Sequence, residues 1–401
     1  MRLDFPPKHT EKIGSVSIHE LQKIYEIDSG KSPILNGNQS IKAFGYDELS
    51  SILRELAIVI PVKNEKLGLL EGVLSGIPNE CLVIIVSNSK RAPDDRFSME
   101  LEMVKQYSRF ADKKIMVINQ KDNELGKIFK KVNYTSILDS KGQVRNGKAE
   151  GMIIGILLAK MQLKKYVGFI DSDNYFPGAV NEYVKIFAAG FGMASTPYSN
   201  IRISWKSKPK IVNNTLVFPK WGRISEFSNK YLNDLISNIT GSKSEIISTG
   251  NAGEHALSMA LAENLNYSSG YSVEPYELID ILEKFGGLLP SNLAGIIKKG
   301  VEIFQIETRN PHLHEEKGND HLTGMLQDSL LAINNSKICN MELTKVIKDH
   351  LLMLQVKSKN NGTNTNNDNK KYHHIMKPLK SIPIETFAEL ILNNCKTLNM
   401  I

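Results

Sequence analysis

Short apolar runs alternate with helical stretches in the first half of the chain. The apolar runs have the length of buried strands, and the stretches between them have the length and apolar spacing of helices. Because consecutive parallel strands need a crossover connection, this alternation predicts an α/β fold, a mostly parallel sheet with helices on its faces. The predicted strands are 56–61, 81–86, 114–119 and 166–170, and the predicted helices are 66–74, 96–110 and 149–161.

The last of these strands ends abruptly at two carboxylates, Asp171 and Asp173. Ligands of open parallel sheets bind outside the carboxyl ends of the strands, and carboxylate oxygens are good ligands for hard divalent cations. Many nucleotide-sugar transferases hold their donor in this way, with a metal between an Asp-x-Asp motif and a diphosphate. A strand followed by an ordinary polar turn would contain the same residue types. Other parts of the sequence therefore have to decide between a metal-binding motif and a turn.

The composition is that of a globular protein. The 401 residues are 41% hydrophobic and 23% charged, which suffices for one large core or two moderate ones. No apolar run follows a basic N-terminal segment, and none approaches the roughly 18 residues that span a bilayer. We therefore expect a cytoplasmic protein without a membrane partner. Three widely separated cysteines, Cys81, Cys339 and Cys395, argue against a disulfide framework and against a thiolate metal site.

The net charge of +7 and the pI near 9.0 allow an anionic partner. The lysines are scattered among acidic residues, and no basic run is interleaved with aromatic residues of the kind that stack on bases. Phosphorylated small molecules therefore fit the charge pattern better than nucleic acid does.

Polar side chains follow the first three predicted strands and precede the helix at 149–161. On one rim of the sheet they can hold a nucleotide sugar by hydrogen bonds and charge, and Lys148 can meet a diphosphate together with exposed helix amides. Ordinary helix caps and polar turns use the same residue types, and a lone lysine at a helix start is usually solvated. The candidate donor-binding residues are Pro61, Lys63, Asn64, Glu65, Ser87, Asn88, Ser89, Lys121 and Lys148.

Seven short motifs are spread along the chain. They are 59–65 (VIPVKNE), 86–91 (VSNSKR), 147–152 (GKAEGM), 168–175 (GFIDSDNY), 220–226 (KWGRISE), 249–255 (TGNAGEH) and 310–315 (NPHLHE). Together and in this order they resemble the mannosyl-3-phosphoglycerate synthase family, with a match that runs to about residue 354 and resumes near residue 376. The resemblance implies a GT-A glycosyltransferase that moves mannose from GDP-mannose to 3-phosphoglycerate with retention of configuration. The product is the phosphorylated precursor of the compatible solute mannosylglycerate.

The resemblance and a change of pattern after residue 195 predict two unequal parts of the chain. Residues 1–195 are the expected donor-binding half, and 196–356 are an α+β extension that binds the acceptor and completes the metal site. The Asn-rich segment 357–371 departs from the family and is nearly devoid of apolar side chains, so it is expected to be a flexible linker. Residues 372–401 form the C-terminal segment. The sequence leaves the oligomeric state open, a homodimer included.

A divalent metal, Mg²⁺ or Mn²⁺, is implied by the resemblance. Transferases of this architecture typically coordinate it through the second carboxylate of the motif, which here is Asp173. His312 and His314 can supply a further ligand, because side chains two residues apart in an extended loop point the same way. His314 is the preferred candidate. An imidazole with two carboxylates suits Mn²⁺ better than Mg²⁺, and both ions stay open.

The acceptor site is expected in two glycine-containing motifs. The first offers a guanidinium suited to bidentate phosphate binding and a hydroxyl, and it is similar to the acceptor-phosphate motif of the more distant glucosyl-3-phosphoglycerate synthases. The second can direct backbone amides at the acceptor carboxylate or at the transferred sugar. The candidate acceptor-binding residues are Gly222, Arg223, Ser225, Gly250, Asn251 and Ala252.

Four carboxylates are the candidate catalytic residues. Asp171 and Asp173 belong to the Asp-x-Asp motif, and Glu254 and Glu274 are candidates for holding mannose hydroxyls. Either glutamate alone would more often be a surface charge, and its occurrence together with the other motifs is what favours a sugar contact. No residue stands out as a nucleophile.

Other functions remain compatible with parts of the pattern. A nucleotidyltransferase normally has a Gly-rich, Lys- or Arg-containing loop after its first strand, where this chain has Pro-Val-Lys-Asn-Glu. A non-catalytic sugar-binding module would need no metal. A related hexosyltransferase that uses GDP-glucose or another phosphorylated acceptor is the nearest alternative.

Overall fold

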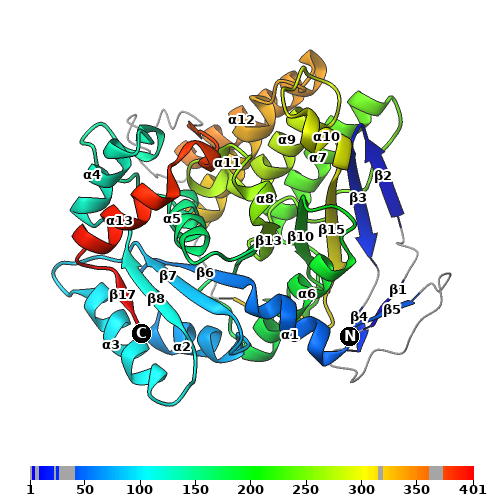
Figure 1. Cartoon of the computed structure of the whole chain (residues 1–401). Coiled ribbons are helices and arrows are strands. Elements are labelled where there is room, and N and C mark those ends of the chain that lie inside the picture. The colour runs from blue at the N-terminus through cyan, green and yellow to red at the C-terminus, as the bar shows by residue number, and fades with distance from the viewer. Residues whose placement is uncertain (1, 5–8, 22–23, 27–40, 315–318, 361–373) are drawn as a thin grey trace.

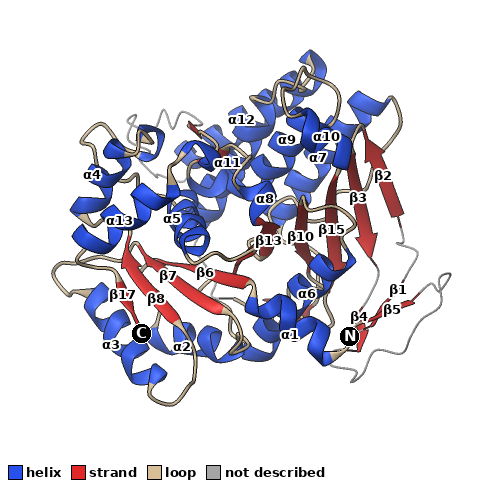
Figure 2. Ribbon diagram, viewed as in Figure 1, coloured by secondary structure: helices blue, strands red, loops and turns tan. Residues whose placement is uncertain are grey.

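The computed structural model describes the chain except residues 1, 5–8, 22–23, 27–40, 315–318 and 361–373. Its centre is a ten-stranded sheet (Figures 1 and 2). The strands are β2 (His9–Ile13), β3 (Val16–Leu21), β6 (Leu56–Val62), β7 (Leu82–Ser87), β8 (Ile115–Asn119), β9 (Tyr166–Phe169), β10 (Ser199–Ser204), β13 (His255–Ser258), β15 (Val301–Glu307) and β17 (Asn399–Met400). Their order is β17-β8-β7-β6-β9-β13-β10-β15-β3-β2.

Two parallel runs make up most of this sheet. The first is β8-β7-β6-β9 and the second is β10-β15-β3. Strand β13 lies between them and is antiparallel to both neighbours. The predicted α/β fold with a mostly parallel sheet is confirmed, and the four strands predicted from the first half of the chain are all present. The antiparallel β13 was not predicted.

Helices cover both faces of the sheet (Figure 1). Successive residues of a strand point to opposite faces, so Val59 of β6 enters one hydrophobic core and Ile60 enters the other. The core of Ile60 is closed by α1 (Tyr46–Arg54), α2 (Leu67–Gly76), α3 (Arg96–Ser108) and α6 (Pro177–Met193). The core of Val59 is closed by α4 (Asn123–Lys131), α5 (Lys148–Met161), α7 (Arg223–Thr240), α8 (Met259–Ala262), α9 (Val273–Phe285), α10 (Ala294–Lys299), α11 (Asn319–Asn334), α12 (Met341–Asn360) and α13 (Ile384–Asn394).

Among the described residues, three small sheets lie outside the central one. They are β4-β1-β5 (Ile24–Glu26, Arg2–Asp4, Ile41–Ala43), the hairpin β11-β12 (Lys210–Val212, Thr215–Val217) and the pair β14-β16 (Tyr267–Ser268, Ile375–Met376). Short 3₁₀ helices occur at Thr135–Ile137, Gly270–Ser272 and Leu379–Ser381. The last pair of strands ties the C-terminal segment to the middle of the chain.

The predicted parts of the chain are joined by the sheet. Strands β10, β13 and β15 extend the sheet of the first half, so no break in the sheet corresponds to residue 195. The C-terminal segment returns to the first half, where β17 pairs with β8 and α13 packs on α4 and α5.

The predicted linker begins too early. Helix α12 continues to Asn360, so 357–360 are helical, because no glycine or proline interrupts the helix before Gly362. Residues 361–371 lie outside the described residues. In the described part of the chain, no helix is both long and apolar enough to cross a bilayer.

Candidate active site

A cavity of about 1010 Å³ opens beyond the carboxyl ends of β6, β7, β8 and β9. The sheet rule places ligands at this edge, and residues from both predicted halves of the chain meet there. The predicted site residues that line the cavity are Pro61, Lys63, Glu65, Asn88, Lys121, Lys148, Asp171, Asp173, Gly222, Ser225, Asn251, Glu274, His312 and His314.

Six other predicted residues do not line the cavity: Asn64, Ser87, Ser89, Gly250, Ala252 and Glu254. The side chain of Arg223 lies outside the described part of the chain, although its backbone begins α7 directly after Gly222.

The strand-end serines are bound to a buried glutamate. The Ser87 and Ser89 hydroxyls donate to the two carboxylate oxygens of Glu100, each at 2.6 Å. The Ser89 hydroxyl in turn accepts the backbone N–H of Asn64 at 2.7 Å. Asn64 has a left-handed backbone (φ 60°), and its side-chain oxygen accepts the N–H of Lys90. These three residues shape the ends of β6 and β7, and Asn88 between the serines is the one whose side chain reaches the cavity.

The Asp-x-Asp loop and the histidine loop are joined by their backbones. Asn174 and His314 form an antiparallel bridge, and the N–H of Tyr175 donates to the carbonyl of Leu313 at 3.0 Å. Because Asn174 follows Asp173 directly, the bridge brings the predicted metal-binding carboxylate and the predicted metal-binding imidazole to the same wall of the cavity.

His312 is held by aromatic neighbours. Its ring stacks on Trp205 with centroids 4.3 Å apart, and its Nδ1 lies 3.4 Å from the hydroxyl of Tyr183. The ring of His314 lies 5.0 Å from that of His312. Burial, with Lys208 nearby, lowers the pKa of His312 well below its ordinary value. The ring is therefore neutral, which is the form that binds a metal.

The donor set fits a divalent cation that is completed by its substrate. Asp173 is 6% exposed and His312 is 4% exposed, and both line the cavity. Among the described residues, no three His, Cys, Asp or Glu side chains converge as a preformed metal site. Within the described ranges, the expected set of an imidazole with two carboxylates is therefore not assembled. One carboxylate with an imidazole would leave positions for diphosphate oxygens and water.

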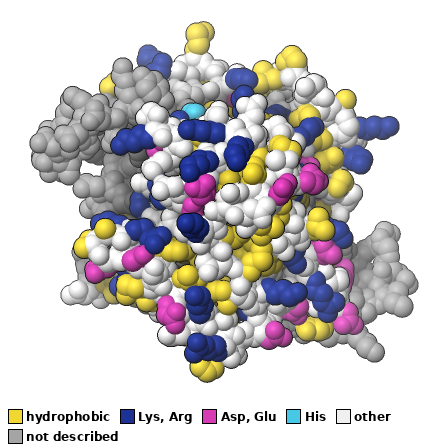
Figure 3. Space-filling model, turned by 60° about the vertical axis from the view of Figure 1, so that its left-hand side comes forward, with side chains coloured by type: hydrophobic (Ala, Val, Ile, Leu, Met, Phe, Trp, Pro, Cys, Tyr) yellow, Lys and Arg dark blue, Asp and Glu magenta, His cyan; other side chains and the backbone are white. Residues whose placement is uncertain are grey.

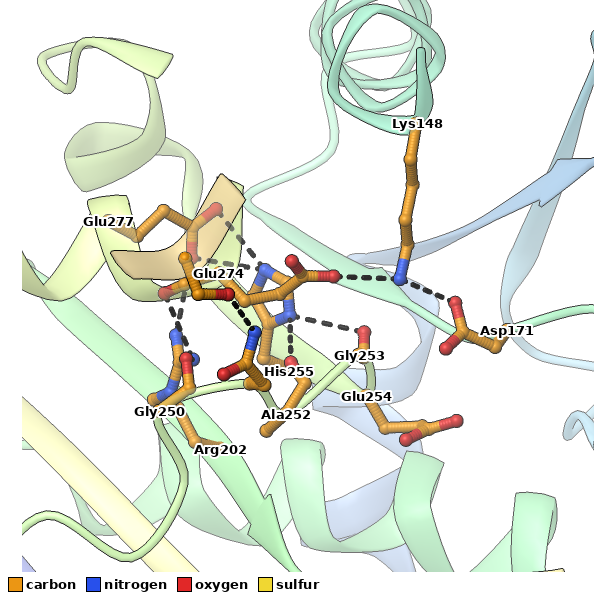
Figure 4. Close-up of polar contacts among 12 residues, drawn as sticks. Lys148, Asp171, Arg202, Gly250, Ala252, Gly253, Glu254, His255, Glu274 and Glu277 are labelled. Atoms are coloured by element: carbon orange, nitrogen blue, oxygen red, sulfur yellow. Dashed lines mark hydrogen bonds and ion pairs between the residues drawn. The ribbon is translucent and has the colours of Figure 1, made fainter. Parts of the chain in front are cut away.

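Lys148 links the two sides of the cavity (Figure 4). It is the first residue of α5, and its ammonium lies 2.6 Å from Oδ1 of Asp171 and 2.8 Å from Oε1 of Glu274. Burial would lower the pKa of Lys148, but the two carboxylates raise it well above its ordinary value. A lone lysine at a helix start is usually solvated, but this ammonium forms ion pairs with two carboxylates before any ligand binds.

Glu254 lies behind the Asp-x-Asp loop. Its side chain is fully buried, and Oε1 accepts from the Asn174 amide at 2.9 Å. The same amide donates to the backbone carbonyl of Asp171. Burial, and secondarily the charge of Asp171, raises the pKa of Glu254 to about 7. Its position supports the loop rather than contacting a sugar in the cavity.

Lys208 and Trp205 line the cavity and were not predicted. The ammonium of Lys208 lies 4.0 Å from the centroid of the Trp205 ring. Burial lowers the pKa of Lys208, and the surrounding carboxylates, Glu254 first, oppose this shift. Nothing in the local sequence marks Lys208, because its acidic neighbours come from distant segments.

Lys and Arg side chains are interspersed with Asp and Glu on the face shown in Figure 3 and form no continuous basic patch there.

Comparison with known proteins identifies the family. The model of the family described as mannosyl-3-phosphoglycerate synthase (osmo_MPGsynth) matches residues 6–391. The chain belongs to this family. The resemblance read from the seven motifs is thereby confirmed, and the glycosyltransferase class predicted from it follows with it.

Two curated mannosyl-3-phosphoglycerate synthases are similar over most of their length. The protein of Pyrococcus furiosus is 44% identical over 393 residues, which cover 98% of this chain and 98% of that protein. The protein of Aeropyrum pernix is 35% identical over 355 residues, covering 88% of this chain and 90% of that protein.

Among solved structures, the chain is similar to glucosyl-3-phosphoglycerate synthase from Mycobacterium tuberculosis in complex with phosphoglyceric acid. The TM-score is 0.48 and the identity is 16%, over 74% of this chain and 86% of that chain. A structure of the same protein with Mn²⁺, uridine diphosphate and phosphoglyceric acid also gives a TM-score of 0.48 and covers 75% of this chain and 85% of that chain.

Proposed function

We propose that this protein transfers mannose from GDP-mannose to 3-phosphoglycerate and forms mannosyl-3-phosphoglycerate. The observation that carries the proposal is the bridge between Asn174 and His314, which joins an Asp-x-Asp loop to a histidine loop at the wall of a large cavity. Family membership and the names of the Pyrococcus furiosus and Aeropyrum pernix relatives support mannose as the sugar and 3-phosphoglycerate as the acceptor.

The donor nucleotide occupies the rim formed by the ends of β6, β7 and β8. Lys63, Glu65 and Asn88 line this rim. Lys121, whose Nζ donates to the carbonyl of Val144, closes it from the side. These groups offer both charge and hydrogen bonds to a guanosine and its ribose.

The diphosphate lies next to Asp173 and the N-terminus of α5, where exposed helix amides favour negative charge. A divalent cation, Mg²⁺ or Mn²⁺, held by Asp173 with His314 or His312, would neutralise the charge that develops on the departing diphosphate. Lys148 holds Asp171 and Glu274 in place beside it.

The mannose and the acceptor lie between Glu274 and α7. Oε2 of Glu274 and Oδ1 of Asn251 are buried acceptors without a hydrogen-bond partner among the described residues, and both residues line the cavity. Sugar or glycerate hydroxyls can donate to these oxygens. Gly222, Arg223 and Ser225 at the start of α7 are proposed to bind the acceptor phosphate.

The transfer is proposed to retain the anomeric configuration. The bond between the anomeric carbon and the diphosphate breaks, and the acceptor hydroxyl attacks the same face and passes its proton to the departing diphosphate. The protein contributes positioning and charge stabilisation, so no protein carboxylate becomes covalently attached to the sugar. The α-mannoside is the expected product, and the one-bond carbon–proton coupling of the anomeric signal distinguishes it from the β-mannoside.

The test is an assay of the purified full-length protein with GDP-mannose and 3-phosphoglycerate, with Mg²⁺, with Mn²⁺ and with a chelator. Phosphorus NMR and mass spectrometry should detect mannosyl-3-phosphoglycerate when either ion is present. GDP-glucose as donor and glycerate as acceptor are the matched controls. Absence of product with both ions, or a preference for GDP-glucose, would refute the proposal.

A further inference from the structure

Three fully buried polar side chains lie behind the acceptor side of the cavity. Arg202 of β10, His255 of β13 and Glu277 of α9 are each 0% exposed. Arg202 and His255 are direct cross-strand partners, and Glu277 contacts both, at 3.4 Å from Nη1 of Arg202 and 3.1 Å from Nε2 of His255. None of the three lines the cavity, so they cannot contact the substrates where they stand.

Building on the proposed function, we propose that this Arg202–His255–Glu277 cluster is a positioning device for the acceptor. It fixes the backbone of 249–253 and the first turn of α9 against Lys148 and Asp171. The affinity for 3-phosphoglycerate therefore depends on three side chains that never touch it.

Arg202 holds two separate segments at once (Figure 4). Its Nε and Nη2 donate to the carbonyl of Thr249 at 3.2 and 2.9 Å, and Nη2 also donates to the carbonyls of Gly250 at 3.4 Å and Glu274 at 3.1 Å. A guanidinium is suited to this task because its donors are fixed in one plane. The loop that carries Asn251 and the helix turn that carries Glu274 are therefore anchored to the same group.

His255 holds the other end of the same loop. Its Nδ1 lies 3.0 Å from the carbonyl of Ala252 and 3.2 Å from that of Gly253, while Nε2 faces the carboxylate of Glu277. Phe169, the last residue of β9, packs against the imidazole with ring centroids 4.9 Å apart. The cluster thus also touches the strand that ends at the Asp-x-Asp loop.

The result is a loop whose carbonyls face the interior. Thr249, Gly250, Ala252 and Gly253 all direct their carbonyl oxygens at Arg202 or His255. Asn251 and Gly253 line the cavity on the other side of the loop, and Gly253 lies against the pair of Lys148 and Asp171. Because Arg202 is bound to both segments, a shift of its guanidinium would move Asn251 and Glu274 together relative to the pair of Lys148 and Asp171.

The test measures the two substrates separately. Arg202→Lys keeps the charge but loses the planar fork, and Glu277→Gln keeps the shape but loses the charge. We expect each to raise the KM for 3-phosphoglycerate about tenfold or more and to lower kcat, because misplacement of a bound acceptor costs transition-state positioning. The affinity for GDP-mannose, measured by calorimetry, should change by less than about threefold, which is small beside the expected acceptor effect.

Asp280→Asn is the matched control. Asp280 is also a buried carboxylate of α9, 1% exposed, and it accepts from Asn266 and pairs with Lys284 away from the cavity. Its substitution should lower the melting temperature as much as Glu277→Gln does while leaving the KM for 3-phosphoglycerate unchanged. An equal rise in this KM for Asp280→Asn would show a general stability effect and overturn the proposal.

The outcomes separate this inference from the proposed function. If the wild-type protein gives no mannosyl-3-phosphoglycerate, the proposed function is wrong. If the wild type is active and Arg202→Lys and Glu277→Gln both keep the wild-type KM for 3-phosphoglycerate, the positioning role is wrong. Should Arg202→Lys not fold, Glu277→Gln and His255→Gln decide the question by the same ratio of KM values.

Discussion

Asn174 pairs with His314 in an isolated antiparallel bridge, which ties the loop after β9 to the loop after β15. The two loops are far apart in the sequence, and the backbone bonds between them hold them side by side. Burial of His312 against Trp205 stabilises the same junction. If the proposed metal site is correct, the bridge holds the loop of Asp173 and the loop of the two imidazoles together before the donor binds, which lowers the ordering cost of binding.

Asp173→Asn tests whether the carboxylate of Asp173 binds the metal. The amide keeps the size of the side chain but removes the charge that would hold a cation, so turnover should fall by about two orders of magnitude or more while the fold is kept. Turnover is measured over a titration of Mg²⁺ and Mn²⁺, and circular dichroism checks the fold. Asp234→Asn on the exposed side of α7 removes one charge elsewhere and should leave turnover unchanged. Near-normal turnover of Asp173→Asn in saturating metal would exclude the metal role.

Gly253→Ala probes the ion pair of Lys148 and Asp171. A Cβ at this position would overlap the Asp171 carboxylate and lie 3.2 Å from Nζ of Lys148, so the pair would have to move. We expect turnover to fall about tenfold or more, since the groups around the reacting atoms would be displaced. Gly178→Ala near the start of α6 is the control, because a Cβ there meets nothing within 4 Å. Equal activity of the two variants would mean that the position of the pair does not matter for turnover.

The serines at the end of β7 give a prediction that distinguishes a structural role of Ser87, which its hydrogen bonds indicate, from the donor contact expected from the sequence. Ser87→Ala would leave one oxygen of the buried Glu100 without its 2.6 Å partner, so the free energy of unfolding should fall by about 1–3 kcal/mol. Its affinity for GDP-mannose should stay close to that of the wild type. Asn88→Ala changes a side chain at the cavity, so it should weaken the binding of GDP-mannose and leave the free energy of unfolding close to that of the wild type. Denaturant unfolding and calorimetry measure the two effects, and a large loss of donor affinity in Ser87→Ala would restore the direct donor contact.

Much of the fold follows from local patterns. The strands β6, β7, β8 and β9 were predictable because their apolar runs are bounded by polar turns. Strand β13 was not, since it has four residues, two of them polar, and exists because β9 and β10 pair with it on either side. Its conformation is decided by tertiary contacts rather than by propensity.

Candidate site residues could be predicted from the sequence where they belong to a short motif of neighbouring residues. The Asp-x-Asp and histidine motifs, predicted to act together, both line the same cavity. The roles of Ser87 and Ser89 were beyond the sequence, because their partner Glu100 lies on the following helix and spacing alone cannot show which way a hydroxyl points. The role of Arg202 was beyond the sequence for the same reason, since its partner Glu277 lies 75 residues further along the chain.

The buried carboxyl of Glu254 predicts how stability depends on pH in the absence of metal. Burial raises its pKa in the folded protein from 4.5 to about 7, so between these values the folded state binds more protons than the unfolded state. Stability from this group is therefore fully present below pH 4.5 and is lost as the pH rises to about 7.

Glu254→Gln keeps an oxygen for the Asn174 amide and has no charge to bury. Relative to the wild type, the variant should gain up to about 3 kcal/mol of unfolding free energy across this window and nothing further above it. Urea unfolding of both proteins with a chelator at pH 5, 6, 7 and 8 measures the difference, and parallel curves would show that Glu254 is ionised throughout.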